Sequence, residues 1–218
     1  MEPWIKQLSG RFLVLDGPDG SGKTTQLQRV AAMARHHGLS VCEVREPGGT
    51  EVGERIRSIL LDPIHDEMTL RCEMLLYMAS RAQLVEQLIL PALEQGQFVI
   101  ADRFLSATIA YQGAGGGLGM ETISTIGKVA VGDGWPDLTL IFDVDQATAQ
   151  QRMKSSLDRI EQRDEAYQQR VREGFLEQAK QDPTRCFVID ATQDLAVVSS
   201  QVDDALADWV SQMAARAL

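Results

Sequence analysis

Near its N-terminus the chain carries the octapeptide Gly17-Pro-Asp-Gly-Ser-Gly-Lys-Thr24. It matches the pattern G-x-x-x-x-G-K-[ST], in which glycines let successive backbone N–H groups converge on bound phosphates. The apolar run 12–16 precedes it and a helical spacing of apolar residues over 23–37 follows, so the loop joins a buried strand to a helix N-terminus. This arrangement predicts a nucleoside triphosphate with Mg²⁺, with Lys23 on the outer phosphates and the Thr24 hydroxyl on the metal.

The alternation of strand and helix continues along the chain. Short runs that are apolar on both faces predict further strands at 40–45, 98–102, 138–143 and 186–190. Helices are expected at 51–61, 68–95, 104–112, 120–131, 145–153, 165–181 and 195–215. Pro91 is expected to kink or divide the long helix. We therefore expect an α/β fold of the P-loop NTPase type, a three-layer α/β/α arrangement with helices on both faces of a five-stranded parallel sheet.

Composition limits the class of protein. The 218 residues are 44% hydrophobic and 24% charged, and no linker divides them, so we expect residues 1–218 to form a single domain. The net charge of −10 argues against nucleic acid or an anionic membrane as partner. No apolar signal core or membrane span is visible, so we expect a cytoplasmic protein. The three cysteines are too widely spaced for a zinc site or disulfide frame, and we expect them to be buried.

Arginine is unusually favoured over lysine, because 16 of the 21 basic residues are Arg. Arg is the side chain that binds phosphate through two parallel hydrogen bonds. Arg45 ends the second predicted strand, and Asp102-Arg103 end the third. The carboxyl ends of parallel strands meet at one edge of the sheet, so these residues and the phosphate loop should line one cationic cleft, with Asp102 near the metal.

The same residues discriminate among P-loop classes. A GTPase switch should carry an Asn-Lys-x-Asp guanine reader, and the sequence has none. A motor ATPase needs partner surfaces and more chain than is visible here. A kinase of a small phosphoryl acceptor needs a second pocket with cationic side chains, which Arg45 and Arg103 would supply. The small-molecule kinase is therefore the favoured class.

Several segments together resemble the bacterial thymidylate kinases. They are the phosphate loop through Thr25, Arg45-Glu-Pro-Gly-Gly-Thr50, Asp102-Arg-Phe104, Ala110-Tyr-Gln-Gly113 and Leu157-Asp-Arg-Ile-Glu-Gln162. The resemblance runs from residue 12 to about 192, and the middle three segments are far more specific than the loop. It implies a dTMP kinase that converts ATP and dTMP to ADP and dTDP with Mg²⁺, supplies a dTTP precursor for DNA synthesis, and works as a homodimer.

The resemblance also implies the site residues. ATP would be bound by Gly17, Pro18, Asp19, Gly20, Ser21, Gly22, Lys23, Thr24 and Thr25, and the metal by Thr24 and Asp102. The dTMP phosphate would be bound by Arg45, Arg57 and Arg103. Tyr77 would stack on thymine, and Arg81, four residues on along the same helix face, would hydrogen-bond the base. Further dTMP contacts would come from Asp19, Thr108, Tyr111 and Gln112, and Tyr111 would crowd the ribose 2′ position.

A mobile lid is implied over 149–162, carrying Arg152, Lys154 and Arg159. Some relatives place a catalytic Arg inside the phosphate loop, whereas this loop has Asp19-Gly20, so the lid-arginine type is implied. Lys154 stands where such relatives often carry Arg. Ser106 stands where they often carry an acidic residue, and this difference leaves the role of Ser106 open. The implied catalytic residues are Asp19, Lys23, Arg103, Arg152 and Lys154.

Two other functions stay open at this point. A P-loop kinase of another nucleotide or small acceptor would share the phosphate loop but should lack the pairing of Tyr77 with Arg81. A non-catalytic adaptor would bind ATP without turnover. A stripe of Ile123, Ile126, Val129 and Ala130 is expected to pack in the core, and part of 68–95 is a candidate for the dimer interface.

Overall fold

A computed structural model describes residues 4–152, 159–160 and 163–216 of the chain. A sheet of five parallel strands forms its middle layer, in the order β2-β3-β1-β4-β5. The strands are β1 (Phe12–Asp16), β2 (Val41–Arg45), β3 (Phe98–Asp102), β4 (Leu138–Asp143) and β5 (Cys186–Asp190). The number of strands, their limits within one residue and their parallel pairing confirm the expected sheet.

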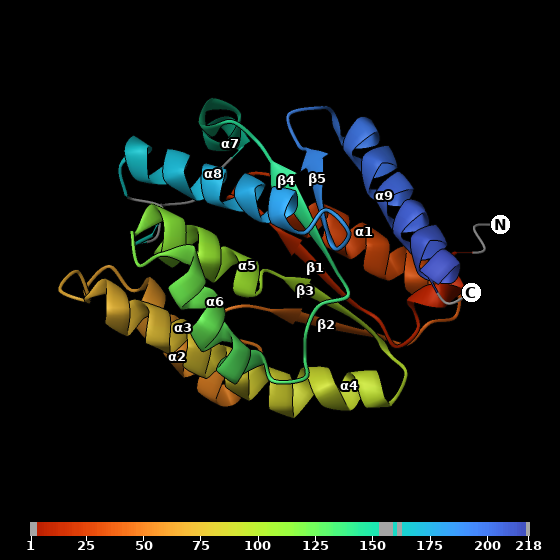
Figure 1. The fold of residues 1–218 in the computed structure, drawn as a ribbon, viewed down its shortest axis with the longest axis horizontal. Helices are drawn as coiled ribbons and strands as arrows, with labels where there is room; N and C mark the ends of the chain where they lie inside the picture. The colour runs from red at the N-terminus through yellow and green to blue at the C-terminus, as the bar shows by residue number, and fades with distance from the viewer. Residues whose placement is uncertain (1–3, 153–158, 161–162, 217–218) are drawn as a thin grey trace.

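Helices cover both faces of this sheet (Figure 1). Two of them, α1 (Lys23–His36) and α9 (Leu195–Arg216), pack on one face. The other face is covered by α3 (Leu70–Leu84), α4 (Leu90–Glu94), α6 (Met120–Val131) and α8 (Glu165–Gln181). The remaining α-helices are α2 (Glu51–Leu61), α5 (Leu105–Thr108) and α7 (Gln146–Arg152). The expected three-layer α/β/α architecture is thus confirmed.

The central strand β1 shows why its residues 12–15 are all apolar. Leu13 and Leu15 point into the core beneath α1 and α9, while Phe12 and Val14 point into the core beneath α3, α4 and α6. All are almost fully buried. Successive side chains of a strand point to opposite faces, so a strand covered on both sides must be apolar throughout.

The long helix predicted over 68–95 is interrupted. Regular α-helix ends at Leu84, a π-helical turn spans Val85–Ile89, and α4 begins at Leu90 with Pro91 in its first turn. Proline lacks the N–H that the preceding helical carbonyl needs, so the hydrogen-bond ladder changes register just before it. A second π-helical segment, Ile109–Gly115, follows α5 and carries Tyr111 and Gln112.

Three further features concern the N-terminal segment, membrane-spanning helices and the cysteines. A short 3-10 helix, Ile5–Leu8, precedes β1. Within the described ranges, no helix is both long and apolar enough to cross a membrane. The prediction that all three cysteines are buried is wrong, because Cys72 is exposed in the first turn of α3 and both Cys42 and Cys186 are partly exposed. All three thiols are free.

Candidate active site

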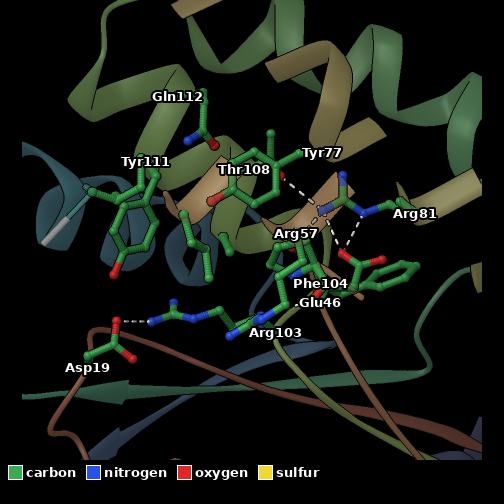
Figure 2. Close-up of a pocket in the computed structure, with 14 residues that line it drawn as sticks. Asp19, Glu46, Arg57, Tyr77, Arg81, Arg103, Phe104, Thr108, Tyr111 and Gln112 are labelled. Atoms are coloured by element: carbon green, nitrogen blue, oxygen red, sulfur yellow. Dashed lines mark hydrogen bonds and ion pairs between the residues drawn. The ribbon is translucent and has the colours of Figure 1, made fainter. Parts of the chain in front are cut away.

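A pocket of about 350 Å³ opens at the carboxyl ends of β1, β2 and β3 (Figure 2). We call it the central pocket. It receives side chains from the loops that follow these strands and from α2, α3, α5 and the π-helical segment after α5. Its lining includes Asp19, Glu46, Pro47, Arg57, Tyr77, Arg81, Arg103, Phe104, Thr108, Tyr111, Gln112 and Ile160. The pocket thus lies at the strand ends, where the sequence predicts the site.

The phosphate loop lies between β1 and α1. Lys23 is buried, and its Nζ lies 3.2 Å from both the Pro18 carbonyl oxygen and Asp19 Oδ1. Burial lowers the pKa of Lys23, and the nearby Arg103 charge lowers it further. Gly20 has φ of +76°, and a Cβ there would collide with the carbonyl of Ala149 in α7. The Lys23 ammonium group therefore contacts the residues at the start of the phosphate loop. The helix α7 packs directly on the same loop, at Gly20.

Two side-chain oxygen atoms that could bind a metal ion lie close together beside this loop. The Thr24 hydroxyl, in the first turn of α1, donates to Asp102 Oδ2 at 2.9 Å, because Asp102 ends β3 in register with Leu15 of the neighbouring β1. Hydroxyl and carboxylate oxygens suit Mg²⁺. No group of three or more His, Cys, Asp and Glu able to hold a metal occurs among the residues described. These two side chains therefore fit a Mg²⁺ that takes its other ligands from phosphate and water.

Arg103 links the phosphate loop to the central pocket. Its backbone has φ of +70°, a strained conformation for a residue with a Cβ. The guanidinium donates to the Gly17 carbonyl at 2.8 Å and to Asp19 Oδ2 at 2.8 Å, and lies 5.2 Å from the centre of the Tyr111 ring. Burial alone would raise the pKa of Asp19, but the charges of Arg103 and Lys23 outweigh it and lower that pKa strongly.

Arg81 lines the central pocket and is almost fully buried. Its Nε and Nη2 donate to Glu46 Oε2 at 2.9 and 2.7 Å, and Nη2 also donates to Thr108 Oγ1 at 2.9 Å. Burial raises the pKa of Glu46 to about 7, although the Arg81 charge opposes the rise. Tyr77 and Arg81 both line the pocket, so their helical spacing places them together as predicted.

A second buried carboxylate, that of Glu73, binds the pocket-lining residue Gln112 and two arginines. Glu73 Oε1 accepts a hydrogen bond from Gln112 Nε2 at 2.8 Å. Its Oε2 lies 2.7 Å from Nη2 of both Arg159 and Arg163. Arg159 also donates from Nε to the carbonyl of Leu60 at 3.0 Å. The segment that contains both arginines is thereby tied to α2 and α3.

Two predicted cations lie elsewhere in this structure. Arg45 is 53% exposed, pairs with Glu54 at 2.8 Å, and is not among the residues that line the central pocket. Arg152 donates to the Ala191 carbonyl at 2.6 Å, in the loop after β5, rather than to the phosphate loop. Arg57 does line the pocket and donates to the Pro47 carbonyl at 2.9 Å. Lys154 lies outside the described residues.

Comparison with known proteins agrees with this geometry. A sequence profile of the thymidylate kinase family matches residues 15–202. The chain is 48% identical to a thymidylate kinase of Exiguobacterium sp. (strain ATCC BAA-1283 / AT1b) and 44% identical to one of Pseudomonas putida (strain GB-1), covering 90% of this chain and 94% of each relative. This chain belongs to the thymidylate kinase family. A solved thymidylate kinase from Ehrlichia chaffeensis superposes with a TM-score of 0.74 at 34% identity, covering 90% of this chain and 97% of that one.

This family member also has acidic residues in its site for which the sequence patterns predict no role. Asp16, fully buried at the end of β1, accepts from the Ser106 hydroxyl at 2.6 Å and from the Gly17 N–H at 2.9 Å, and burial raises its pKa. Glu46 and Glu73 neutralise arginines. Glu73 stands four residues before Tyr77 and eight before Arg81, so helical spacing could have indicated it. The expected cationic cleft is therefore a cleft of paired charges.

Proposed function

We propose that the protein transfers the γ-phosphate of ATP to dTMP, giving ADP and dTDP. The observation that carries this proposal is the position of Arg103, which bridges two separate sites. Its guanidinium contacts Gly17 and Asp19 of the phosphate loop, yet it also lines the central pocket. A cation at such a junction suits a phosphoryl group passing between donor and acceptor.

The proposed chemistry needs little proton transfer. The nucleophile is a phosphate oxygen of dTMP, already anionic at neutral pH, so no general base is required. The difficulty is to bring two polyanions together in line, which positioning and cations can overcome. Lys23 would leave Asp19 for the donor phosphates. Arg103 would neutralise the acceptor, and the fixed backbone of Arg103 would hold its guanidinium in place.

Thr24 and Asp102 would hold Mg²⁺ at the donor side. When bound, the metal neutralises charge on the phosphate oxygens. The Ser21 hydroxyl in the same loop is buried and has no hydrogen-bond partner in the part of the chain that the structure describes. A bound phosphate would supply that partner, which supports the proposed donor site. The backbone N–H groups of the loop and the N-terminus of α1 would complete the donor site.

The central pocket would take dTMP. Tyr77 would stack on the base, Arg81 and Thr108 would meet its edge, and Gln112 would border it. Arg57 and Arg103 would bind the phosphate, and Asp19 would contact the acceptor phosphate or the 3′-hydroxyl. Arg45 reaches that phosphate only after it leaves Glu54, so its contribution requires a change of partner.

We further propose that 149–162 acts as the lid. Its described ends already contact the two sites, since Ala149 packs on Gly20 and Ile160 lines the central pocket. Arg152 would have to leave the Ala191 carbonyl to reach the donor phosphates. Arg159 would act from its position on Glu73. Lys154 belongs to this proposal by its place in the sequence.

We also propose a homodimer formed through α2, α3 and α6. The helices α2 and α6 each pack against α3, and all three expose apolar side chains, among them Val52, Ile59, Leu75 and Val129. The expectation that the 123–130 stripe packs wholly in the core is wrong at Val129, which is 86% exposed. An apolar face of this kind is typical of an interface between subunits. A cytoplasmic location stays a prediction from the sequence.

Incubation with ATP, Mg²⁺ and dTMP tests the proposed reaction. ADP and dTDP should form in equal amounts, as measured by separating the nucleotides by ion-exchange chromatography. Release of inorganic phosphate without dTDP would mean that the protein is an ATPase. ATP binding without any turnover would support the adaptor instead.

A further inference from the structure

We propose that Glu73 is a positioning residue that fixes the direction of the Gln112 side-chain amide and thereby sets which base edge the central pocket accepts. The inference rests on the proposed function, because it concerns the base of the phosphoryl acceptor. Neither Glu73 nor its bond to Gln112 is required by the chemistry of phosphoryl transfer. The role is one of specificity.

Glu73 is fully buried in the first turn of α3 and makes use of both carboxylate oxygens. Oε2 receives the guanidinium groups of Arg159 and Arg163, each at 2.7 Å. A guanidinium group has only donors, so the Glu73 carboxylate accepts from both arginines, and a carboxylate has no hydrogen of its own to donate. Oε1 is thereby left as an obligatory acceptor, and it lies 2.8 Å from Nε2 of Gln112.

A glutamine amide has a donor end and an acceptor end, and only its partners decide which end faces a ligand. Because Glu73 accepts, Gln112 must turn its NH₂ group toward Glu73. Figure 2 shows the consequence, since the Gln112 oxygen faces Tyr77 and Thr108 in the pocket and the nitrogen is turned away from them. Reversing the amide would set the Gln112 oxygen against a carboxylate oxygen, which is unfavourable for a buried pair.

The pocket therefore presents hydrogen-bonding groups of fixed direction. Gln112 offers an acceptor. Arg81, whose guanidinium has only donors, lines the same pocket. Its Nε and Nη2 are bonded to Glu46 and Thr108, whereas Nη1 donates one hydrogen to Met78 Sδ at 3.1 Å and has a second N–H to offer a base. A base edge with a carbonyl oxygen beside an N–H, as in thymine or uracil, complements this pattern. Cytosine presents an amino group beside an unprotonated ring nitrogen, which is the reverse pattern. A site built for one polarity rejects the other strongly, because buried polar groups are left unpaired.

Glu73 has a second, separable task. Ile160, which lies between Arg159 and Arg163 in the chain, forms part of the pocket lining. Loss of an arginine contact to Glu73 should loosen this wall and weaken binding of any nucleotide. Loss of the Glu73 charge should in addition free the Gln112 amide to turn. Only the second effect changes the choice between bases.

Three variants separate these tasks. Arg163→Gln removes one arginine contact but leaves the carboxylate, so it is the matched control. Glu73→Gln replaces the acceptor-only group with one that can also donate. The double variant Glu73→Gln/Arg163→Gln removes one negative and one positive charge together, so the cluster keeps its net charge. The kcat/KM values for dTMP and dCMP are measured for each, with thermal unfolding as the check on folding.

We expect wild type to prefer dTMP, Arg163→Gln to keep the dTMP-to-dCMP ratio within about threefold, and both Glu73→Gln variants to lower that ratio at least about tenfold. An unchanged ratio in the folded Glu73→Gln variants, or a wild type that uses dCMP as well as dTMP, overturns the proposal. If neither variant folds, Glu73→Asp decides, because it keeps a carboxylate and must keep the ratio. A wild type without dTMP turnover rejects the proposed function itself.

Discussion

Arg81 and Glu46 form an ion pair that is closed off from solvent, with Arg81 Nη2 at 2.7 Å from Glu46 Oε2 and the side chains only 1% and 3% exposed. The pair joins α3 to the loop after β2, and 35 residues of sequence separate its members. Only one carboxylate oxygen is used. Glu46 Oε1 has no hydrogen-bond partner within the described part of the chain. Burial of this half-satisfied carboxylate has a consequence that depends on pH.

The free energy of unfolding should carry the titration of Glu46. Burial raises its pKa from 4.5 to about 7. Between these values the unfolded chain loses the proton while the folded protein keeps it, so the contribution to stability is full below about pH 4.5 and falls as pH rises to about 7. Relative to Glu46→Gln, wild type should lose up to about 3 kcal/mol across this range and then level off. Urea unfolding of both proteins from pH 4.5 to 8 measures the difference. If wild type instead becomes more stable relative to Glu46→Gln as pH rises, the Arg81 charge outweighs burial.

Removal of either cation near the phosphate loop should lower turnover. Lys23→Ala and Arg103→Ala are each expected to reduce kcat/KM by about a hundredfold to a thousandfold, equivalent to roughly 3–4 kcal/mol of transition-state binding. Steady-state kinetics with ATP and dTMP measure the loss. Lys180→Ala, an exposed lysine on α8, is the control and should behave like wild type. Near-normal turnover in both site variants would remove these residues from the mechanism.

Tyr111 should select deoxyribose. Its ring is buried, lines the central pocket and lies 5.2 Å from the Arg103 guanidinium carbon. Tyr111→Ala should remove the side chain that crowds the ribose 2′-hydroxyl and so raise the use of UMP relative to dUMP. Tyr111→Phe keeps the ring and should keep the wild-type ratio. The role is wrong if the UMP-to-dUMP ratio of kcat/KM is the same in all three proteins.

The proposed dimer face predicts a change of oligomeric state. A charge at Val129, the most exposed apolar residue of α6, should be excluded from an apolar interface and shift the protein toward monomer. Sedimentation equilibrium of Val129→Glu against wild type measures this shift. Val197→Glu places the same charge at an exposed position of α9 and should leave the mass of the oligomer unchanged. A monomeric wild type, or a Val129→Glu variant that stays dimeric, would reject this face.

The parts of the site that follow strand ends could be predicted from sequence. Asp102 ends β3 and Arg103 directly follows it, and parallel packing brings both to the phosphate loop whatever the details of the side chains. Tyr77 and Arg81 share a helix face because of their spacing alone. In both cases the backbone decides the position, and backbone patterns are what a sequence shows most clearly.

The partners of the charges could not be predicted in the same way. Arg45 and Arg152 lie in the strand and the helix that the sequence predicts, but their long side chains bind Glu54 and the Ala191 carbonyl in this structure. Glu73 meets Arg163 across 90 residues of sequence. Such pairings depend on how helices pack, and composition gives no account of them. The net charge of −10 does not tell where the carboxylates lie, and some of them line or flank the cleft while others lie on the outer surface of the protein.

The proposed activity is tested most directly by one coupled ADP-release assay, run with ATP, Mg²⁺ and each of dTMP, dUMP, UMP, dCMP and AMP as acceptor. The geometry of Arg81, Tyr77 and Arg103 predicts that dTMP gives the highest kcat/KM, with the ribonucleotides and dCMP far below it. Higher kcat/KM with any other acceptor would identify a different kinase. ATP binding without ADP release for every acceptor would contradict the account altogether.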